Sequence, residues 1–212
     1  YKDISFSHKN KMEDLKTIKV ASDSGKMYAR IKKIKHKKVI YYFIENKHSF
    51  KTSSTDKPEN KGEQFAFFNK AILEMLPQIN FKPNIIHSHG WKTALLNLFL
   101  KDWSWKKLFY KNIKTVFTFH NLQKQGIFSK SILKNITGLN MSHFNREGVE
   151  FYGKVNFLKG GLNFSDVLTT VSPTYAEEIK TVEYGEGLQG LFKKREDDLY
   201  GITNGIDYKK YN

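Results

Sequence analysis

The sequence predicts an α/β fold, a three-layer α/β/α Rossmann-like domain built on a mainly parallel sheet. Short apolar runs rich in β-branched and aromatic residues alternate along the chain with segments of helical period, as in successive βαβ units. Several of these runs stop abruptly at polar residues or glycine. Ligands bind at the carboxyl ends of parallel strands, so these stops are candidate functional sites.

The first third of the chain contains one clear strand and one clear helix. Residues 1–37 are rich in lysine and weakly patterned, and the apolar run Val39–Ile44 then predicts a strand. Polar residues 51–62 predict a surface loop. Apolar residues at helical spacing predict a helix over Glu63–Leu76 that ends at Pro77.

Strands and helices alternate through the rest of the chain, apart from an irregular section between about residues 120 and 153. Predicted strands cover residues 83–90, 115–119, 166–172 and 199–203, and predicted helices cover residues 91–100, 155–164 and the segment after 172. Ser172 supplies an N-cap for the last of these helices, and Pro173 fits its first turn. Gly160 and Gly161 interrupt the middle helix, where we expect a neighbouring backbone to approach closely.

Length and composition bound the class of protein. The 212 residues are enough for one substantial core, so a single domain is the simplest organisation. The chain has no cysteine for a disulfide framework, and no apolar run approaches the ~20 residues that span a bilayer. We expect a soluble, cytoplasmic protein that binds no membrane. Because the chain starts at Tyr1 and ends just after a motif, we also expect it to be a segment of a longer protein.

The net charge of +15 raises the possibility of nucleic-acid binding. The arginines, however, are confined to Arg30, Arg146 and Arg195, while lysines run along the whole length. Nucleic-acid readers favour the bidentate guanidinium of arginine. We therefore expect no specific nucleic-acid binding, and a surface charge that helps to attract anionic substrates.

Three predicted strand ends carry polar residues that are candidates for function. The first is His87-Ser-His89-Gly90-Trp91, the second is His120-Asn121 and the third is Asn204-Gly205. All three should lie on one edge of a parallel sheet. Asn204-Gly205 is equally explained as a turn that supplies positive φ.

The histidines leave two interpretations open. Because His87 and His89 are two residues apart on a strand, they point the same way, as metal ligands would. Without a nearby third ligand we expect no metal, and the alternative is that one packs inside and the other caps the next helix. His120 is either a histidine whose hydrogen bonds are satisfied within the fold or a functional residue. The following Asn121 and Gly126 favour a loop that faces a ligand.

Several enzyme classes lack their motifs here. A glycosidase of the usual type needs two carboxylates at strand ends, and Asp207 is the only one found there. The Gly-x-Ser-x-Gly elbow of serine hydrolases is absent. Neither a Walker loop nor a dinucleotide-binding Gly-x-Gly-x-x-Gly occurs. Covalent and P-loop chemistry are therefore disfavoured, and no cofactor is expected.

A series of motifs resembles those of bacterial glycogen synthases and plant starch synthases in order and spacing. The resemblance covers roughly residues 38–212, and its motifs are Pro83–Leu96, Thr115–Gly126, Asn156–Leu162, Thr169–Ile179, Glu183–Leu188 and Gly201–Asp207. It implies the GT-B fold, in which two Rossmann-like domains face a cleft. It also implies transfer of glucose from a sugar nucleotide to the non-reducing end of an α-1,4-glucan, with retention.

By this resemblance, residues 1–212 are one N-terminally truncated, acceptor-side catalytic domain. The Lys-x-Gly-Gly-Leu loop of the family is missing from the sequence, and so is the C-terminal nucleotide-binding domain. The resemblance implies a catalytic role for His120 beside the donor glucose, and donor-sugar contacts from Asn121 and Asn204. It implies acceptor-side positions at Phe50, His89, Gly90, Trp91 and Gln125. The partners would be ADP-glucose or UDP-glucose and an α-1,4-glucan, and the chain alone should be catalytically silent.

Two positions depart from the family pattern. Gly90 stands where aspartate is common, and Phe50-Lys51 stands where an aromatic, often tyrosine, precedes an arginine-containing segment. Loss of a carboxylate removes an acceptor for sugar hydroxyls, at a cost of about 1–3 kcal/mol in binding. A glucan-binding module without transfer activity is therefore the alternative, and the many aromatic residues suit it.

Overall fold

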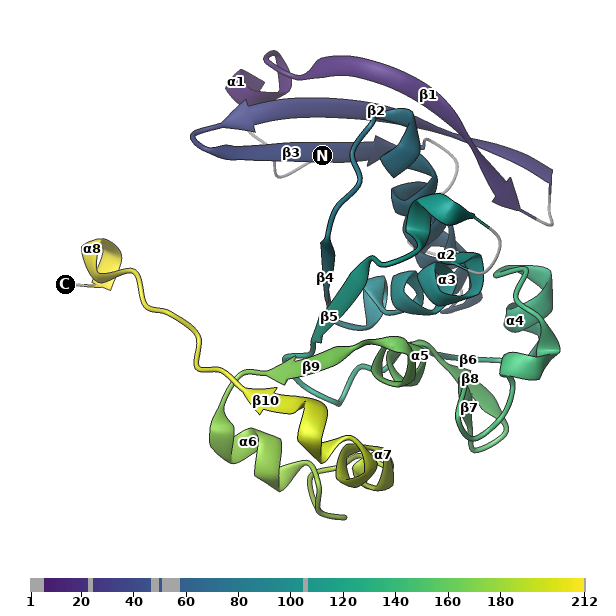
Figure 1. Cartoon of the computed structure of the whole chain (residues 1–212), viewed down its shortest axis with the longest axis vertical. Helices are drawn as coiled ribbons and strands as arrows, with labels where there is room; N and C mark the ends of the chain where they lie inside the picture. Colours follow the sequence, from purple (N-terminus) through teal and green to yellow (C-terminus); the bar gives the residue numbers. More distant parts are fainter. Residues whose placement is uncertain (1–5, 23–24, 47–49, 51–57, 105–106, 212) are drawn as a thin grey trace. The chain divides into compact units, whose positions relative to one another are not determined.

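The computed structural model describes residues 6–22, 25–46, 50, 58–104 and 107–211. Its contacts separate two compact units (Figure 1), which we call unit 1 (residues 1–82 and 131–141) and unit 2 (residues 83–130 and 142–212). The single domain predicted from the sequence stays a prediction. Among the helices of the described residues, none combines the length and the apolar character needed to cross a membrane.

Unit 1 is an antiparallel sheet with a long helix against it. The sheet order is β1 (Glu13–Ser22), β2 (Gly25–His36) and β3 (Val39–Glu45). Its register pairs Ile18 with Ala29 and Ile31 with Ile44, so that these side chains share the face that packs against α2 (Pro58–Gln78). The short helices α1 (Phe6–Lys9) and α4 (Ser131–Asn135) complete the unit.

The prediction of a weakly patterned start was wrong, because residues 13–36 form two of the longest strands. In the middle of both strands, residues such as Lys19 and Arg30 face away from α2, and they alternate with the buried residues Ile18, Val20, Ala29 and Ile31. This is the period-two alternation of a sheet with one face packed on the core. The frequency of lysine concealed that alternation.

The boundaries of α2 also differ from the prediction. The helix begins at Pro58, inside the predicted loop, of which residues 51–57 lie outside the described residues. It contains Pro77 and ends one residue later. Asn80 takes a left-handed φ of 54°, and the Phe81 N–H donates to the carbonyl of Leu76 at 3.0 Å. This is the usual hydrogen-bonded ending of a helix, so the left-handed turn and not Pro77 stops α2.

Unit 2 contains the predicted parallel sheet. The strand order is β10 (Leu199–Gly201), β9 (Val167–Thr170), β5 (Lys114–Thr118) and β4 (Ile85–His89), all parallel. Its helices are α3 (Leu95–Ser104), α5 (Phe157–Phe164), α6 (Pro173–Glu178) and α7 (Gln189–Lys194). Ser172 caps α6 as predicted, since its side chain accepts from the Tyr175 N–H. The α/β class with a parallel sheet is therefore confirmed.

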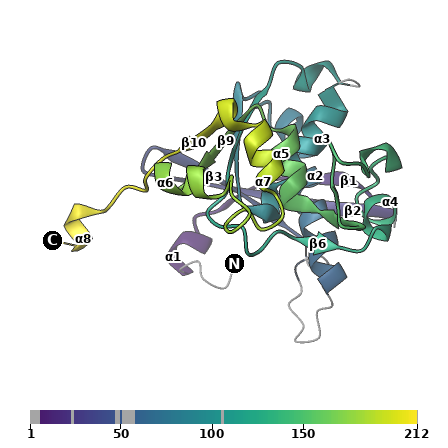
Figure 2. The same ribbon diagram turned by 90° about the horizontal axis from the view of Figure 1, so that it is seen from below.

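The remaining elements of the described chain are short. Residues 120–153, predicted to be irregular, contain β6 (Ile127–Phe128) and β7 (Glu150–Phe151), which flank β8 (Lys154–Asn156) in a small antiparallel sheet. The helix predicted from residue 155 thus starts later, with Asn156 as its N-cap, and the one predicted from residue 91 opens as a 3₁₀ turn (Trp91–Thr93). Further 3₁₀ turns lie at Leu108–Tyr110, Met141–His143 and Glu196–Asp198. In both views the segment after β10 leaves the sheet and ends in α8 (Tyr208–Tyr211) (Figure 1 and Figure 2).

One face of the parallel sheet carries the core of unit 2. Phe117, Phe119 and Leu168 from the strands pack with residues of α5 and α7, and Phe119 stacks on Phe192 at 5.3 Å between ring centroids. Gly161 of α5 explains the glycine pair. A Cβ at Gly161 would lie 2.8 Å from the Ala94 Cβ and 2.9 Å from the Phe117 ring. The close neighbours are therefore side chains, where we had predicted backbone.

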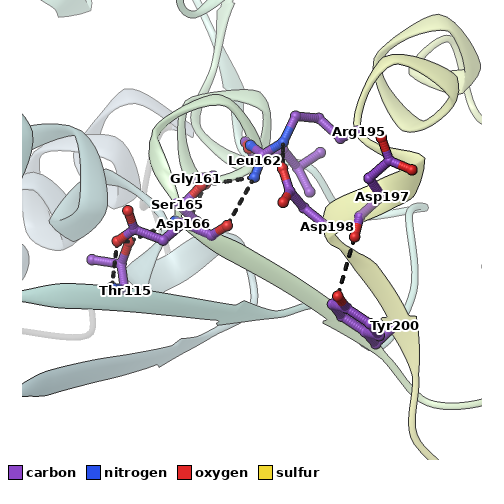
Figure 3. A network of polar contacts seen from close by, with 9 residues as sticks. All are labelled: Thr115, Gly161, Leu162, Ser165, Asp166, Arg195, Asp197, Asp198 and Tyr200. Carbon is purple, nitrogen blue, oxygen red and sulfur yellow. Dashed lines mark hydrogen bonds and ion pairs between the residues drawn. The ribbon is translucent and has the colours of Figure 1, made fainter.

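Arg195 ties the end of α5 to the start of β9. Its guanidinium donates to the carbonyls of Leu162 at 2.7 Å, Ser165 at 2.9 Å and Asp166 at 3.3 Å, and to the carboxylate of Asp198 at 2.9 Å (Figure 3). The Asp166 carboxylate in turn accepts from the backbone and the hydroxyl of Thr115. These bonds satisfy carbonyls that the end of a helix leaves without partners.

Candidate functional site

The period of two along β4 and β5 places three histidines on one face of the parallel sheet. Ser88 and Phe117 are buried on the face that carries the core. His87 and His89 therefore point to the opposite face, and so does Thr118. His120 continues this alternation past the end of β5, because Phe119 between them is buried in the core.

The three imidazoles form a row, which we call the histidine row (His87, His89 and His120). Ring centroids are 4.2 Å apart for His87 and His89, and 5.9 Å apart for His89 and His120, whose planes are 29° from parallel. The His87 Nε2 lies 2.6 Å from the Thr118 hydroxyl, which lies 2.5 Å from the Thr169 hydroxyl on β9. The row is thus joined by hydrogen bonds to two further strands.

These positions confirm that His87 and His89 point the same way, and two of the three predicted strand ends meet. The alternative, in which one of these histidines packs inside, was wrong, because Ser88 is the buried residue and both histidines are exposed. The described residues contain no group of three or more His, Cys, Asp or Glu side chains placed to hold a metal ion.

Electrostatics favour a neutral His89. Partial burial lowers the pKa of its imidazole below 6.5, and the nearby imidazoles of His87 and His120 lower it further. A proton on His89 would be desolvated and would repel charge on either neighbour. Near neutral pH the middle ring of the row is therefore uncharged, so it can both donate and accept a hydrogen bond.

We predict that His89→Gln makes stability less dependent on pH between about 7 and 5. Because the pKa of folded His89 lies below 6.5, the unfolded chain binds more protons as the pH falls through that value, and folded wild type loses stability. Glutamine does not titrate. Melting temperatures measured across this range should fall less steeply for His89→Gln than for wild type. Equal slopes for His89→Gln and wild type would contradict the assignment.

His120 also lines an open cavity of about 360 Å³, which we call the His120 pocket. This volume is within the roughly 300–1,000 Å³ typical of small-ligand sites. Three segments of unit 2 contribute to it: the loop after β5, the start of α6 and the segment before α7. The lining residues are His120, Asn121, Leu122, Gln123, Val171, Tyr175, Glu183, Tyr184 and Glu186.

The sequence pattern did not predict the acidic and aromatic residues of this pocket. Glu183, Tyr184 and Glu186 belong to the family motif Glu183–Leu188, and no expectation about the pocket was attached to them. The signal that was available is the pattern Gly185-Glu186-Gly187, since glycines around a polar residue mark a turn with unusual φ angles. Gly187 indeed has a φ of 80°.

The other predicted site residues of unit 2 are not among the residues that line this pocket. Asn204 follows β10, is exposed, and lies on the segment that leaves the sheet. The Trp91 ring packs against Gly126, where a Cβ would come within 2.3 Å of it. Gly90 donates its N–H to the Thr118 carbonyl at 2.8 Å and takes φ 67° and ψ 170°, a conformation essentially confined to glycine.

Gln125 and Phe50 both have structural contacts. Gln125 is 6% exposed, and its side chain is bonded to Asn156 and to the backbone of Glu186. Phe50 belongs to unit 1, where its ring lies 6.1 Å from that of Phe67. Lys51 lies outside the described residues.

A parallel α/β sheet with a ligand-sized pocket at the carboxyl ends of its strands defines a Rossmann-like domain. The family model described as the starch synthase catalytic domain matches residues 1–194. The chain therefore belongs to the starch synthase catalytic domain family, and the resemblance seen in the sequence is confirmed.

Relatives and a solved structure agree with this assignment. The glycogen synthases of Desulforamulus reducens and Alkaliphilus metalliredigens are 48% and 44% identical over the whole chain, which corresponds to 44% and 45% of their own lengths. The catalytic domain of starch synthase IV from Arabidopsis thaliana, bound to ADP and acarbose, superposes with a TM-score of 0.82 at 30% identity, over 95% of this chain and 42% of that one. The fold is thus that of one part of a GT-B enzyme, and the chain spans less than half the length of these relatives.

Proposed function

We propose that this chain is the acceptor-side domain of a glucosyltransferase that extends an α-1,4-glucan with retention, using ADP-glucose as donor. The observation that carries the proposal is the position of His120, stacked beside His89 and lining a ligand-sized pocket with Asn121. Membership of the starch synthase family supports it. The choice of ADP-glucose over UDP-glucose rests on the ADP bound to Arabidopsis starch synthase IV.

The proposed chemistry asks two things of this chain. As the bond between the anomeric carbon and the diphosphate breaks, positive charge develops on the glucosyl ring, and a preorganised acceptor stabilises it. The backbone carbonyl of His120 is suited to this role, while Asn121 and Asn204 offer amides to sugar hydroxyls. His89, Gly90, Trp91, Gln125 and Phe50 are the proposed acceptor-side residues.

A glucan-binding module without transfer activity is the second candidate, and Gly90 favours it. A residue other than glycine at φ 67° and ψ 170° would carry backbone strain of about 1–3 kcal/mol. The backbone here is therefore adapted to glycine and ill suited to an aspartate that would bind sugar hydroxyls. Acceptor binding would then depend on other groups of the site.

The two candidates are separated by a hybrid protein. The 212-residue chain alone, incubated with ADP-glucose and maltooligosaccharides, should produce no elongation. Joined to the parts of Desulforamulus reducens glycogen synthase that precede and follow the matched region, it should extend the oligosaccharides from ADP-glucose, with new α-linkages visible by NMR.

Turnover by the chain alone would contradict the proposal that this domain needs the rest of the enzyme for catalysis. A folded hybrid that binds maltooligosaccharides without elongating them would favour the binding module. The unmodified Desulforamulus enzyme is the positive control for both measurements.

A further inference from the structure

The segment Glu183–Gly187 carries backbone strain beside the pocket. Glu186 takes a left-handed φ of 46°, and Gly187 follows it at 80°. Left-handed backbone is uncommon for residues other than glycine and is retained where the surrounding structure holds it. Strain of this kind often accompanies a functional site, so the question is what holds Glu186 and what its side chain faces.

A buried amide chain holds this segment. Asn156, fully buried, donates to the Gln125 side-chain carbonyl at 2.5 Å, and the Gln125 amide donates to the Glu186 carbonyl at 3.1 Å. The Asn156 carbonyl also caps α5 by accepting from the Lys159 N–H at 2.9 Å. Gln125 is therefore hydrogen-bonded to the residue that caps α5, and its amide group faces the strained turn. Its side-chain carbonyl is occupied by Asn156, and one of its amide protons is occupied by the Glu186 carbonyl.

The chemistry of this side of the His120 pocket suits a neutral sugar. Glu183 and Glu186 line it together with Tyr175 and Tyr184, and His120 and Asn121 line the same pocket. Carboxylates accept hydrogen bonds from hydroxyls, and aromatic faces pack against the apolar faces of sugar rings. Two carboxylates also disfavour the phosphates of a sugar nucleotide. The lining thus favours a neutral glucan over a diphosphate, although the chain as a whole has a net charge of +15.

We propose that Glu183–Gly187 forms a glucan-binding wall of the His120 pocket, in which Glu183 and Glu186 accept hydrogen bonds from glucan hydroxyls and Gln125 is a positioning residue that holds Glu186 in place. The proposal rests on the proposed glucan-extending function and adds residues to its acceptor side. It changes the role of Gln125 from a direct glucan contact to a support for one.

Isothermal titration of maltotetraose into the 212-residue chain tests the contact. Glu186→Gln, which keeps size and backbone, should weaken binding about threefold to tenfold, because a charged acceptor is lost. Glu196→Gln is the matched control, since Glu196 is exposed, belongs to unit 2 and lies outside the pocket lining. Inorganic pyrophosphate, as an anionic probe, should bind Glu186→Gln no more weakly than wild type.

Gln125→Leu tests the positioning role. It should weaken maltotetraose binding to a similar degree, and the double variant Gln125→Leu with Glu186→Gln should be no weaker than either single variant, because both act through one contact. Additive losses would overturn the positioning role, since a general loss of stability would add to the effect of Glu186→Gln. Circular dichroism melting checks that each variant is folded.

The outcomes separate this proposal from the proposed function. If wild type binds maltotetraose and Glu186→Gln binds as tightly as Glu196→Gln, the glucan-binding wall is refuted and the glucosyltransferase assignment stands. If wild type binds no maltotetraose, the glucan-binding wall is refuted, and elongation by the hybrid still decides the glucosyltransferase assignment.

Discussion

His120→Ala in the active hybrid is expected to lower kcat by about 10²-fold to 10³-fold, with little change in the KM for maltooligosaccharides. His120 lies at the end of β5 with its ring stacked on His89 and lining the pocket, where a preorganised group is worth more than in water because it needs no reorganisation as charge develops. Loss of one such group typically costs this much.

The measurement is initial-rate kinetics with ADP-glucose and maltooligosaccharides. Asn121 lines the same pocket. Asn121→Ala should lower kcat less than His120→Ala does, because it removes a contact that is present both before and during the reaction. His36→Ala, in the sheet of unit 1, is the control for general effects of removing a histidine. A His120→Ala hybrid with near-wild-type kcat would contradict the catalytic assignment.

Arg195→Ala is expected to lower the free energy of unfolding by about 2–4 kcal/mol. The side chain is 15% exposed and bonds to three backbone carbonyls and to the Asp198 carboxylate. Alanine leaves those carbonyls near the end of α5 without a donor, and a half-buried acceptor without a partner costs about 1–3 kcal/mol. Arg195→Lys should retain only part of the stability, because an ammonium cannot reproduce the planar array of donors.

Urea unfolding followed by tryptophan fluorescence suits this test. The tryptophans of the chain all fall within residues 83–130, so the signal reports unit 2. Arg146→Ala removes an exposed arginine of the same unit and should change the free energy of unfolding by no more than about 0.5 kcal/mol. Equal losses for Arg195→Ala and Arg146→Ala would show that the carbonyl contacts add no stability.

The sequence predicted the histidine row in part. Strand positions, period-two alternation and parallel order together require His87, His89 and His120 to share a face at neighbouring strand ends, and the structure brings their rings within stacking distance. The first two strands escaped prediction although they follow the same alternation, because lysines at the outward positions resemble an unstructured segment. The alternation of a strand was present in these residues, but the high lysine content obscured it.

The acidic side of the pocket shows where sequence reasoning stops. Gln125 and Glu186 are 61 residues apart and meet through a hydrogen bond from a side chain to a backbone carbonyl. Neither residue carries a periodic signal that would predict this contact.

By itself, the sequence determined the α/β class, the parallel strands of unit 2 and the polar residues at their ends, because alternation and helical spacing are local properties of the chain. Only the tertiary structure decided that Glu183, Tyr184 and Glu186 line the pocket with His120, and that Gln125 is buried beneath it. Loops come together through packing between residues far apart in the sequence, and no local period records such contacts.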